Sequence, residues 1–143
     1  MRYPSLWNAA RTLPLAVALL AGPPAVWAGP ASDAVVERLI SEQLPDVAGR
    51  ELEMITVQYP PGGASEPHRH GAYVLVYVLE GSVQMGIRGH NPVTLRAGQT
   101  FIERPEDVHQ VSRNASTTQP AKFLVVFLKK AGEPLTVPVS ARP

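Results

Sequence analysis

Two of the four histidines lie two residues apart, as His68 and His70. Along a β-strand, residues i and i+2 point to the same face, so both imidazoles can reach one metal ion while Arg69 points away. His109 follows later, at the start of another predicted strand, and distant strands can be neighbours in an antiparallel barrel. Three imidazoles without a thiolate suit Fe, Zn, Cu or Ni and leave coordination positions open for water or substrate. His68, His70 and His109 are therefore candidate metal ligands.

Other polar residues near these histidines are candidates for catalysis. Glu103 lies six residues before His109, where it could orient an imidazole or act as a general base, and we name it as the catalytic candidate. The alternative is an exposed strand-end charge beside Arg104. Glu66 is a second carboxylate candidate, but it stands next to a proline in a loop. His90 lies in a glycine-rich turn and is expected to take no part.

The elements that must position these side chains are mostly strands. Runs of alternating or continuous apolar residues, separated by Gly and Pro turns, predict seven strands: 52–59, 73–79, 83–88, 93–96, 100–103, 108–113 and 122–128. The continuous run at 73–79 indicates a strand buried on both sides, although Tyr73 and Tyr77 would share one face. This spacing is typical of a β-sandwich or barrel. The predicted fold class is all-β.

The two segments that flank these strands have different patterns. Ser32 and Asp33 resemble a helix start, and apolar residues follow at helical spacing until Pro45. We therefore expect one short helix packed outside the barrel, within an N-terminal helix and linker at residues 29–50. The barrel domain is expected at 51–130, and the Pro-rich tail 131–143 is expected to be loose, with 135–139 as a further strand candidate.

The chain resembles the cupin superfamily over roughly residues 50 to 130. Its first motif, G-x5-H-x-H-x3,4-E-x6-G, is similar to the segment with Gly62, His68, His70 and Gly81. Its second, G-x5-P-x-G-x2-H-x3-N, is similar to the segment with Gly98, Pro105, His109 and Asn114, where Asp107 replaces the usual glycine. The resemblance implies a double-stranded β-helix jelly roll with the metal inside the barrel, bound by the three histidines.

One position departs from the cupin pattern in a way that changes the chemistry. The glutamate that supplies the fourth ligand in the first motif is replaced by Val74. Three neutral imidazoles leave the full charge of a divalent ion, which favours a small anionic, chelating substrate. Three-histidine members of the family include thiol dioxygenases and a β-diketone-cleaving dioxygenase. The resemblance therefore implies a metal-dependent dioxygenase or lyase. The alternatives are a non-catalytic module that binds or senses a small ligand or metal, and a barrel without metal.

The first 28 residues resemble a cleaved secretory signal peptide. Arg2 and Arg11 are their only charges, the apolar run 13–21 follows, and Val26 and Ala28 place small residues at the −3 and −1 positions of a cleavage site. Nine apolar residues that include a proline cannot span a bilayer, so no stable membrane anchor is expected. We expect a periplasmic or secreted protein. Outside the reducing cytosol, Zn, Cu, Ni and Mn compete with Fe, so the metal identity stays open.

Composition excludes several other classes. The 143 residues suit one domain, and they contain no cysteine, which excludes disulfides, thiolate zinc sites and cysteine nucleophiles. Thirteen Lys and Arg balance twelve Asp and Glu, with no basic cluster, so nucleic-acid binding has no electrostatic support. The expected partner is a small molecule. A homodimer is a further expectation, with the apolar helix face and segment 135–139 as contact surfaces.

Overall fold

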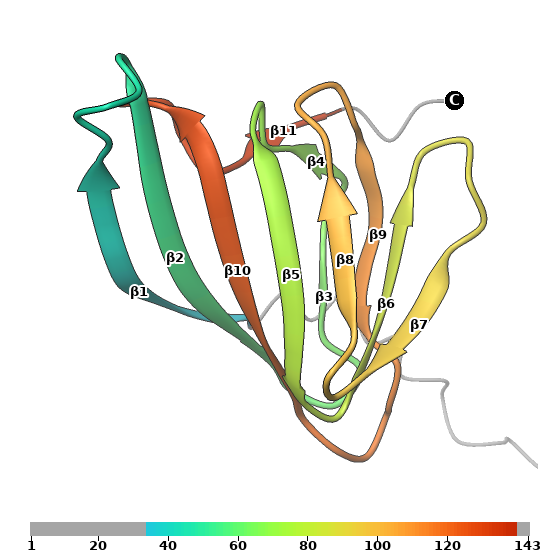
Figure 1. The fold of residues 1–143 in the computed structure, drawn as a ribbon. Helices are drawn as coiled ribbons and strands as arrows, with labels where there is room; N and C mark the ends of the chain where they lie inside the picture. Colours follow the sequence, from blue (N-terminus) through green and yellow to red (C-terminus); the bar gives the residue numbers. More distant parts are fainter. Residues whose placement is uncertain (1–33, 140–143) are drawn as a thin grey trace, which may run out of the picture.

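The computed structural model describes residues 34–139 and folds them into two antiparallel sheets that face each other (Figure 1). The order in the first sheet is β1 (Val35–Gln43), β2 (Arg50–Tyr59), β10 (Ala121–Lys130), β5 (Tyr73–Glu80) and β8 (Thr100–Glu103). The order in the second is β11 (Val137–Pro138), β4 (His68–Arg69), β9 (His109–Asn114), β6 (Ser82–Ile87) and β7 (Val93–Arg96), and β3 (Ala64–Ser65) also pairs with β9. The all-β class is confirmed.

The seven strands predicted from periodicity all form. Strands β7 and β8 have the predicted bounds, and the others differ from them by at most two residues at either end. Non-sequential neighbours bring β10 between β2 and β5, and β9 between β4 and β6. These crossovers place segments that are far apart in the sequence side by side, which is how a histidine of β9 comes to face those of the β4 region.

The predicted N-terminal helix is wrong within the described residues. The segment Val35–Gln43 is strand β1, which pairs with β2 at the edge of the first sheet, and it is exposed along its whole length. The register shifts between Arg38 and Ile40, and such a bulge lets a helix-like spacing of apolar residues fit a strand. An exposed helix of this length is marginal alone, whereas β1 gains a full ladder of hydrogen bonds from the free edge of β2.

Strand β5 is buried on one face only, contrary to the prediction from its continuous apolar run. Val74, Val76 and Val78 are buried inside the barrel, whereas Tyr73 and Tyr77 point outward and are about half exposed. The β4 strand does not continue into β5, because Gly71 turns the chain between the two sheets with a φ of 61°. The outward tyrosines therefore lie away from the histidines.

Gly81 joins β5 of one sheet to β6 of the other. Its φ is +70°, and a Cβ atom at this position would lie 2.5 Å from the carbonyl oxygen of Pro120. Only glycine accepts both this conformation and this close approach without strain. The glycine that ends the first motif is therefore required by the connection between the sheets.

The described part of the tail is attached to the barrel instead of being loose. Strand β11 pairs with β4, with Pro138 opposite His68, and Leu135 packs against the core. Figure 1 shows β4 and β11 together at one end of the barrel. The tail consequently helps to fix the segment that carries two of the three candidate ligands. Within the described range, no helix has the length and hydropathy needed to span a bilayer.

Candidate metal centre

The three predicted ligands come together inside one end of the barrel. His68 on β4 and His109 on β9 are directly opposite each other in the pairing of these strands. His70 follows β4 and is buried. One ring nitrogen from each of the three imidazoles can act as a ligand, and these three nitrogens lie within 4.8 Å of one another. The convergence that the HxH spacing predicted is therefore confirmed, and His109 completes the cluster.

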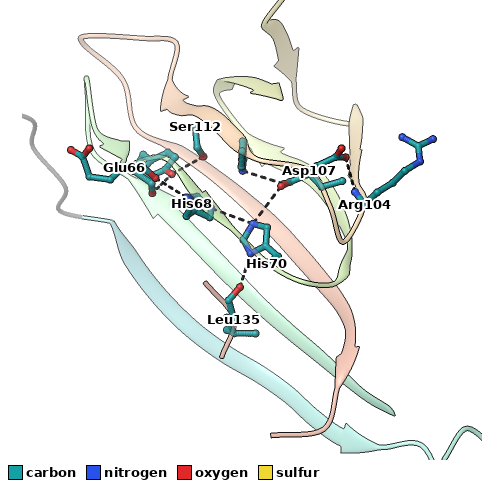
Figure 2. Close-up of polar contacts among 11 residues, drawn as sticks. Glu66, His68, His70, Arg104, Asp107, Ser112 and Leu135 are labelled. Carbon is teal, nitrogen blue, oxygen red and sulfur yellow. Dashed lines mark hydrogen bonds and ion pairs between the residues drawn. The ribbon is translucent and has the colours of Figure 1, made fainter. Parts of the chain in front are cut away.

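Backbone carbonyls set the tautomers of two of these imidazoles. His68 donates from Nδ1 to the carbonyl of Glu66 at 2.7 Å, and His70 donates from Nδ1 to the carbonyl of Leu135 at 2.6 Å. Figure 2 shows both contacts. A carbonyl can only accept, so in each neutral ring the other nitrogen, Nε2, presents a lone pair. The two Nε2 atoms face each other at 3.2 Å, an arrangement that a shared cation stabilises.

Burial keeps two of the histidines neutral. The pKa of His70 is lowered from 6.5 to about 4, first by burial and also by the neighbouring His68. The pKa of His109 is lowered from 6.5 to about 3, first by burial and then by His68 and His70. Neutral imidazole is the form that ligates metals, so at neutral pH these side chains are already in the state that a metal site requires.

Glu103 lies beside two of the histidines. Its Oε1 is 3.2 Å from Nδ1 of His109, and its Oε2 is 3.5 Å from Nε2 of His70. The side chain is almost fully buried, and this burial, together with the charge of Asp107 as the smaller cause, raises the pKa of Glu103 from 4.5 to about 8. The alternative of an exposed strand-end charge is therefore excluded by its position.

Unpartnered polar atoms at the centre fit a bound metal ion. Neither ring nitrogen of His109 nor Oε2 of Glu103 has a hydrogen-bond partner among the described residues, although all three atoms are buried. Buried polar atoms normally have a hydrogen-bond partner, so an unpartnered one indicates that a water molecule, an ion or a ligand binds there. A divalent ion at the cluster would satisfy the orphaned imidazole and the facing lone pairs of His68 and His70. The donor set of neutral imidazoles is one that Zn, Cu, Ni and Fe accept.

The other sequence candidates lie in different places. Val74 is fully buried and directly opposite Glu103 in the pairing of β5 with β8. Glu66 contacts His68 only through its main-chain carbonyl, and its residue is exposed. His90 is exposed in its turn. The structure thus brings Glu103 to the histidines and leaves Glu66 and His90 outside the cluster.

The remaining residues of the second motif have structural roles. Asp107 accepts a hydrogen bond from the backbone N–H of Arg104 at 2.8 Å, which closes the turn before His109 (Figure 2). Asn114 donates from its amide to the carbonyls of Pro60 and Gln119 and accepts from the N–H of Ser116. These contacts hold β9 in place at both ends.

A cavity of about 480 Å³ opens beside the histidine cluster. Most of its wall is apolar, with Ile55, Val57, Val76, Met85, Phe123, Val125 and Phe127 contributed by four strands. Its polar lining consists of the three histidines, Glu66, Glu103, Ser65, Ser112 and Thr136, and no lysine or arginine of the described range lines it. The cavity therefore suits a small molecule with a largely apolar body.

Sequence reasoning missed two features of this site. The first is the tail residue Leu135, whose carbonyl orients His70, and the alternation of apolar residues at 135–139 was its only signal. The second is the pair of hydroxyls of Ser65 and Ser112, which no motif marks. Both features depend on strand pairings between segments that are far apart in the chain.

Comparison with solved structures identifies the fold. The DMSP lyase DddQ from Ruegeria pomeroyi DSS-3 matches with a TM-score of 0.60 at 24% identity, covering 73% of this chain and 51% of that one. A recombinant oxalate oxidase in complex with glycolate matches with a TM-score of 0.58 at 27% identity, covering 76% and 56%. An uncharacterized protein with a double-stranded β-helix domain from Klebsiella pneumoniae subsp. pneumoniae MGH 78578 has a TM-score of 0.59 at 16% identity, covering 73% and 84%. The double-stranded β-helix fold is therefore confirmed.

The chain spans only about half the length of the lyase and oxidase chains that it matches. Curated protein sequences give no match. The sequence profile of the Cupin domain matches residues 55–127, a segment that holds His68, His70 and His109 together with Glu103. Because this match takes in half of the chain and the barrel has the corresponding fold, the chain belongs to the cupin family.

Proposed function

We propose that this cupin is a metal-dependent dioxygenase or lyase that acts on a small anionic compound, with His68, His70 and His109 as the ligands of a divalent transition metal. The observation that carries the proposal is the pair of facing lone pairs on Nε2 of His68 and His70, 3.2 Å apart, beside the buried Nε2 of His109, which has no hydrogen-bond partner among the described residues. Bound there, a divalent ion would supply Lewis acidity and, if redox-active, electron transfer to dioxygen.

Glu103 is the proposed acid or base of the reaction. Its Oε2 atom has no hydrogen-bond partner among the described residues and belongs to a carboxyl that lines the cavity. The raised pKa, about 8, means that this carboxyl exchanges its proton near neutral pH in the metal-free protein. Glu103 can therefore hold a proton at Oε2 and pass it to, or take it from, a substrate atom beside His70.

The anionic character of the proposed substrate depends on the metal charge. The cavity wall contributes no lysine or arginine from the described residues, so the protein itself offers no cation to a carboxylate or enolate. Three neutral imidazoles leave most of the charge of a divalent ion available for such a group. The similar solved structures include a DMSP lyase and an oxalate oxidase with bound glycolate, which supports a small polar substrate.

We also propose that the protein is exported to the periplasm or secreted. The support is the three-part pattern of residues 1–28, with cleavage near Ala28. These residues lie outside the described range, so the proposal depends on the sequence pattern alone.

A homodimer is proposed through the outer face of the first sheet, in place of the helix face that does not form. Cross-strand partners build one apolar row across all five strands, with Ile40, Met54, Val126, Leu75 and Ile102. Leu75 and Ile102 are each about half exposed. Such a wide apolar row on a sheet face supports an association with a second copy of the chain.

The activity is tested with protein purified without added metal and then loaded separately with Fe(II), Zn(II), Ni(II), Cu(II) or Mn(II). Each form is assayed for oxygen uptake and for product release with thiols, β-diketones and hydroxylated aromatic acids. Activity that Glu103→Gln abolishes, and that the control Glu80→Gln at the exposed end of β5 leaves unchanged, supports the proposal. Tight binding of these compounds without turnover in any metal form would instead establish a binding or sensing role.

A further inference from the structure

Three hydroxyl groups meet behind the wall of the cavity. The Oη atom of Tyr59 is 2.5 Å from Oγ of Ser65 and 2.9 Å from Oγ of Ser112. Tyr59 is fully buried and does not line the cavity, whereas both serines do. The tyrosine thus fixes two hydroxyls that face the space where a substrate would lie.

Strand pairing places these serines at a defined distance from the histidines. Ser65 is directly opposite Ser112 in the pairing of β3 with β9, just as His68 is opposite His109 in the pairing of β4 with β9. Residues three apart normally face opposite sides of a strand. The register shift in the β6–β9 pairing, between Gly86 and Ile87, inserts an extra residue and lets His109 and Ser112 both face the cavity. The Ser65–Ser112 pair and the His68–His109 pair are separated by about 10 Å along β9.

One of the three hydroxyl protons is not used in the hydrogen bonds among these groups and can be donated to a ligand. Two hydrogen bonds join the three groups and use two of their three protons. If both serines donated to Tyr59, its own buried proton would have no acceptor among the described residues, which is unfavourable. When Tyr59 donates to one serine and accepts from the other, the remaining proton is on a serine that lines the cavity. The wall therefore presents a hydroxyl donor at this position.

We propose that Ser65 and Ser112, positioned by Tyr59, form a subsite that donates a hydrogen bond to an uncharged oxygen acceptor, such as a carbonyl, at the end of the substrate remote from the histidines. The proposal rests on the proposed function for the orientation of the substrate, with its chelating group at the histidine cluster. The described cavity lining has no cation that could compensate a second carboxylate, so an uncharged acceptor is preferred. The substrate class is a metal-chelating molecule with an apolar body and a distal carbonyl or similar oxygen.

The test uses two hydroxamates of nearly equal shape, 4-acetylbenzohydroxamate and 4-isopropylbenzohydroxamate, with nickel-loaded protein. Only the acetyl compound carries a distal acceptor. We expect the wild type to bind it more tightly by about three- to tenfold in Kd, measured by calorimetry. Ser65→Ala and Ser112→Ala should each reduce this preference, and the double variant should abolish it. Ser41→Ala, on the exposed β1 strand, is the control and should keep it. Melting temperatures verify that each variant folds.

A second arm does not depend on the metal. Metal-free protein is titrated with acetophenone and with isopropylbenzene, which lack a chelating group, and binding is followed by ligand-observed NMR. A preference for acetophenone that Ser112→Ala removes supports the subsite, whether or not nickel binds. Failure of nickel to bind would overturn the proposed metal site but not the subsite. Equal binding of both members of each pair in the wild type, or an unchanged preference in the double serine variant, overturns the subsite.

Discussion

Val74 and Glu103 are directly opposite each other in the pairing of β5 with β8, and both side chains are buried inside the barrel. Val74 stands where the first cupin motif has its glutamate, so the site has no carboxylate on β5. Glu103 supplies one from the neighbouring strand, within 3.5 Å of His70 and 3.2 Å of His109. The centre therefore keeps a carboxylate although the motif position has lost it.

The first prediction exchanges the positions of these two side chains. Val74→Glu alone places a second buried carboxyl next to Glu103, and the burial of this group without a partner should destabilise the metal-free protein by about 3 kcal/mol. Divalent metal should offset much of this loss, because the added anion raises metal affinity. The double variant Val74→Glu/Glu103→Val should regain stability without metal. Thermal unfolding with and without added metal measures all three forms, and a Val74→Glu variant with unchanged metal-dependent melting would mean that this position does not face the centre.

The second prediction concerns the ligands. His68→Ala, His70→Ala and His109→Ala should each lower metal affinity by at least about tenfold, because each removes one of three donors. Metal content after purification and chelator competition are the measurements. His90→Ala is the matched control, since this histidine is exposed in a turn. Equal metal loss in the His90 variant would refute the ligand assignment.

The third prediction is that the stability of the metal-free protein is highest near pH 6.5. His70 and His109 have a pKa lowered from 6.5 to about 4 and about 3, so below pH 6.5 the unfolded chain binds more protons at these groups and stability falls. The pKa of Glu103 is raised from 4.5 to about 8, so the folded chain binds the extra proton between these values and stability falls as pH rises.

From pH 4.5 to 6.5 the two histidines change the free energy of unfolding more than the single carboxyl does, so stability rises with pH. From pH 6.5 to about 8 only Glu103 still changes it, so stability falls. Thermal unfolding across this range in the presence of a chelator gives the profile. Glu103→Gln should remove the decline above pH 6.5. A melting temperature of the parent that rises steadily to pH 8 would contradict the assignment of these groups.

The fourth prediction concerns export. The mature N-terminus should be Gly29 or lie within a few residues of it, because Val26 and Ala28 satisfy the small-residue rule. Mass spectrometry of the native protein measures this directly, and retention of Met1 would refute it. Ala28→Leu should block or shift the cleavage, while Ala31→Leu, beyond the site, should leave it in place.

The fifth prediction concerns the proposed dimer. Leu75→Lys and Ile102→Lys should each shift the protein toward the monomer, because a charge within the outer apolar row opposes its burial in an interface. Val93→Lys is the control, because this apolar side chain on the edge strand β7 of the other sheet is exposed to a similar extent. Sedimentation velocity measures the three variants. A wild-type protein that is monomeric at every concentration would exclude this interface.

The sequence alone determined the seven central strands and the convergence of His68, His70 and His109. Strands can be predicted from local sequence, because the alternation of apolar residues and the turn residues act over a few positions. The HxH spacing places two candidate ligands on one face of a strand. The cupin motifs then added the third histidine.

Tertiary structure decided the features that depend on distant neighbours. Segment Val35–Gln43 is a strand because the free edge of β2 offers it hydrogen bonds, which its own helical spacing could not reveal. Glu103 reaches the histidines because β8 pairs with β5, and Leu135 orients His70 because β11 pairs with β4. The burial that shifts the pKa of Glu103 exists only when the two sheets pack together. The bulge that turns Ser112 toward the cavity exists only when β6 pairs with β9.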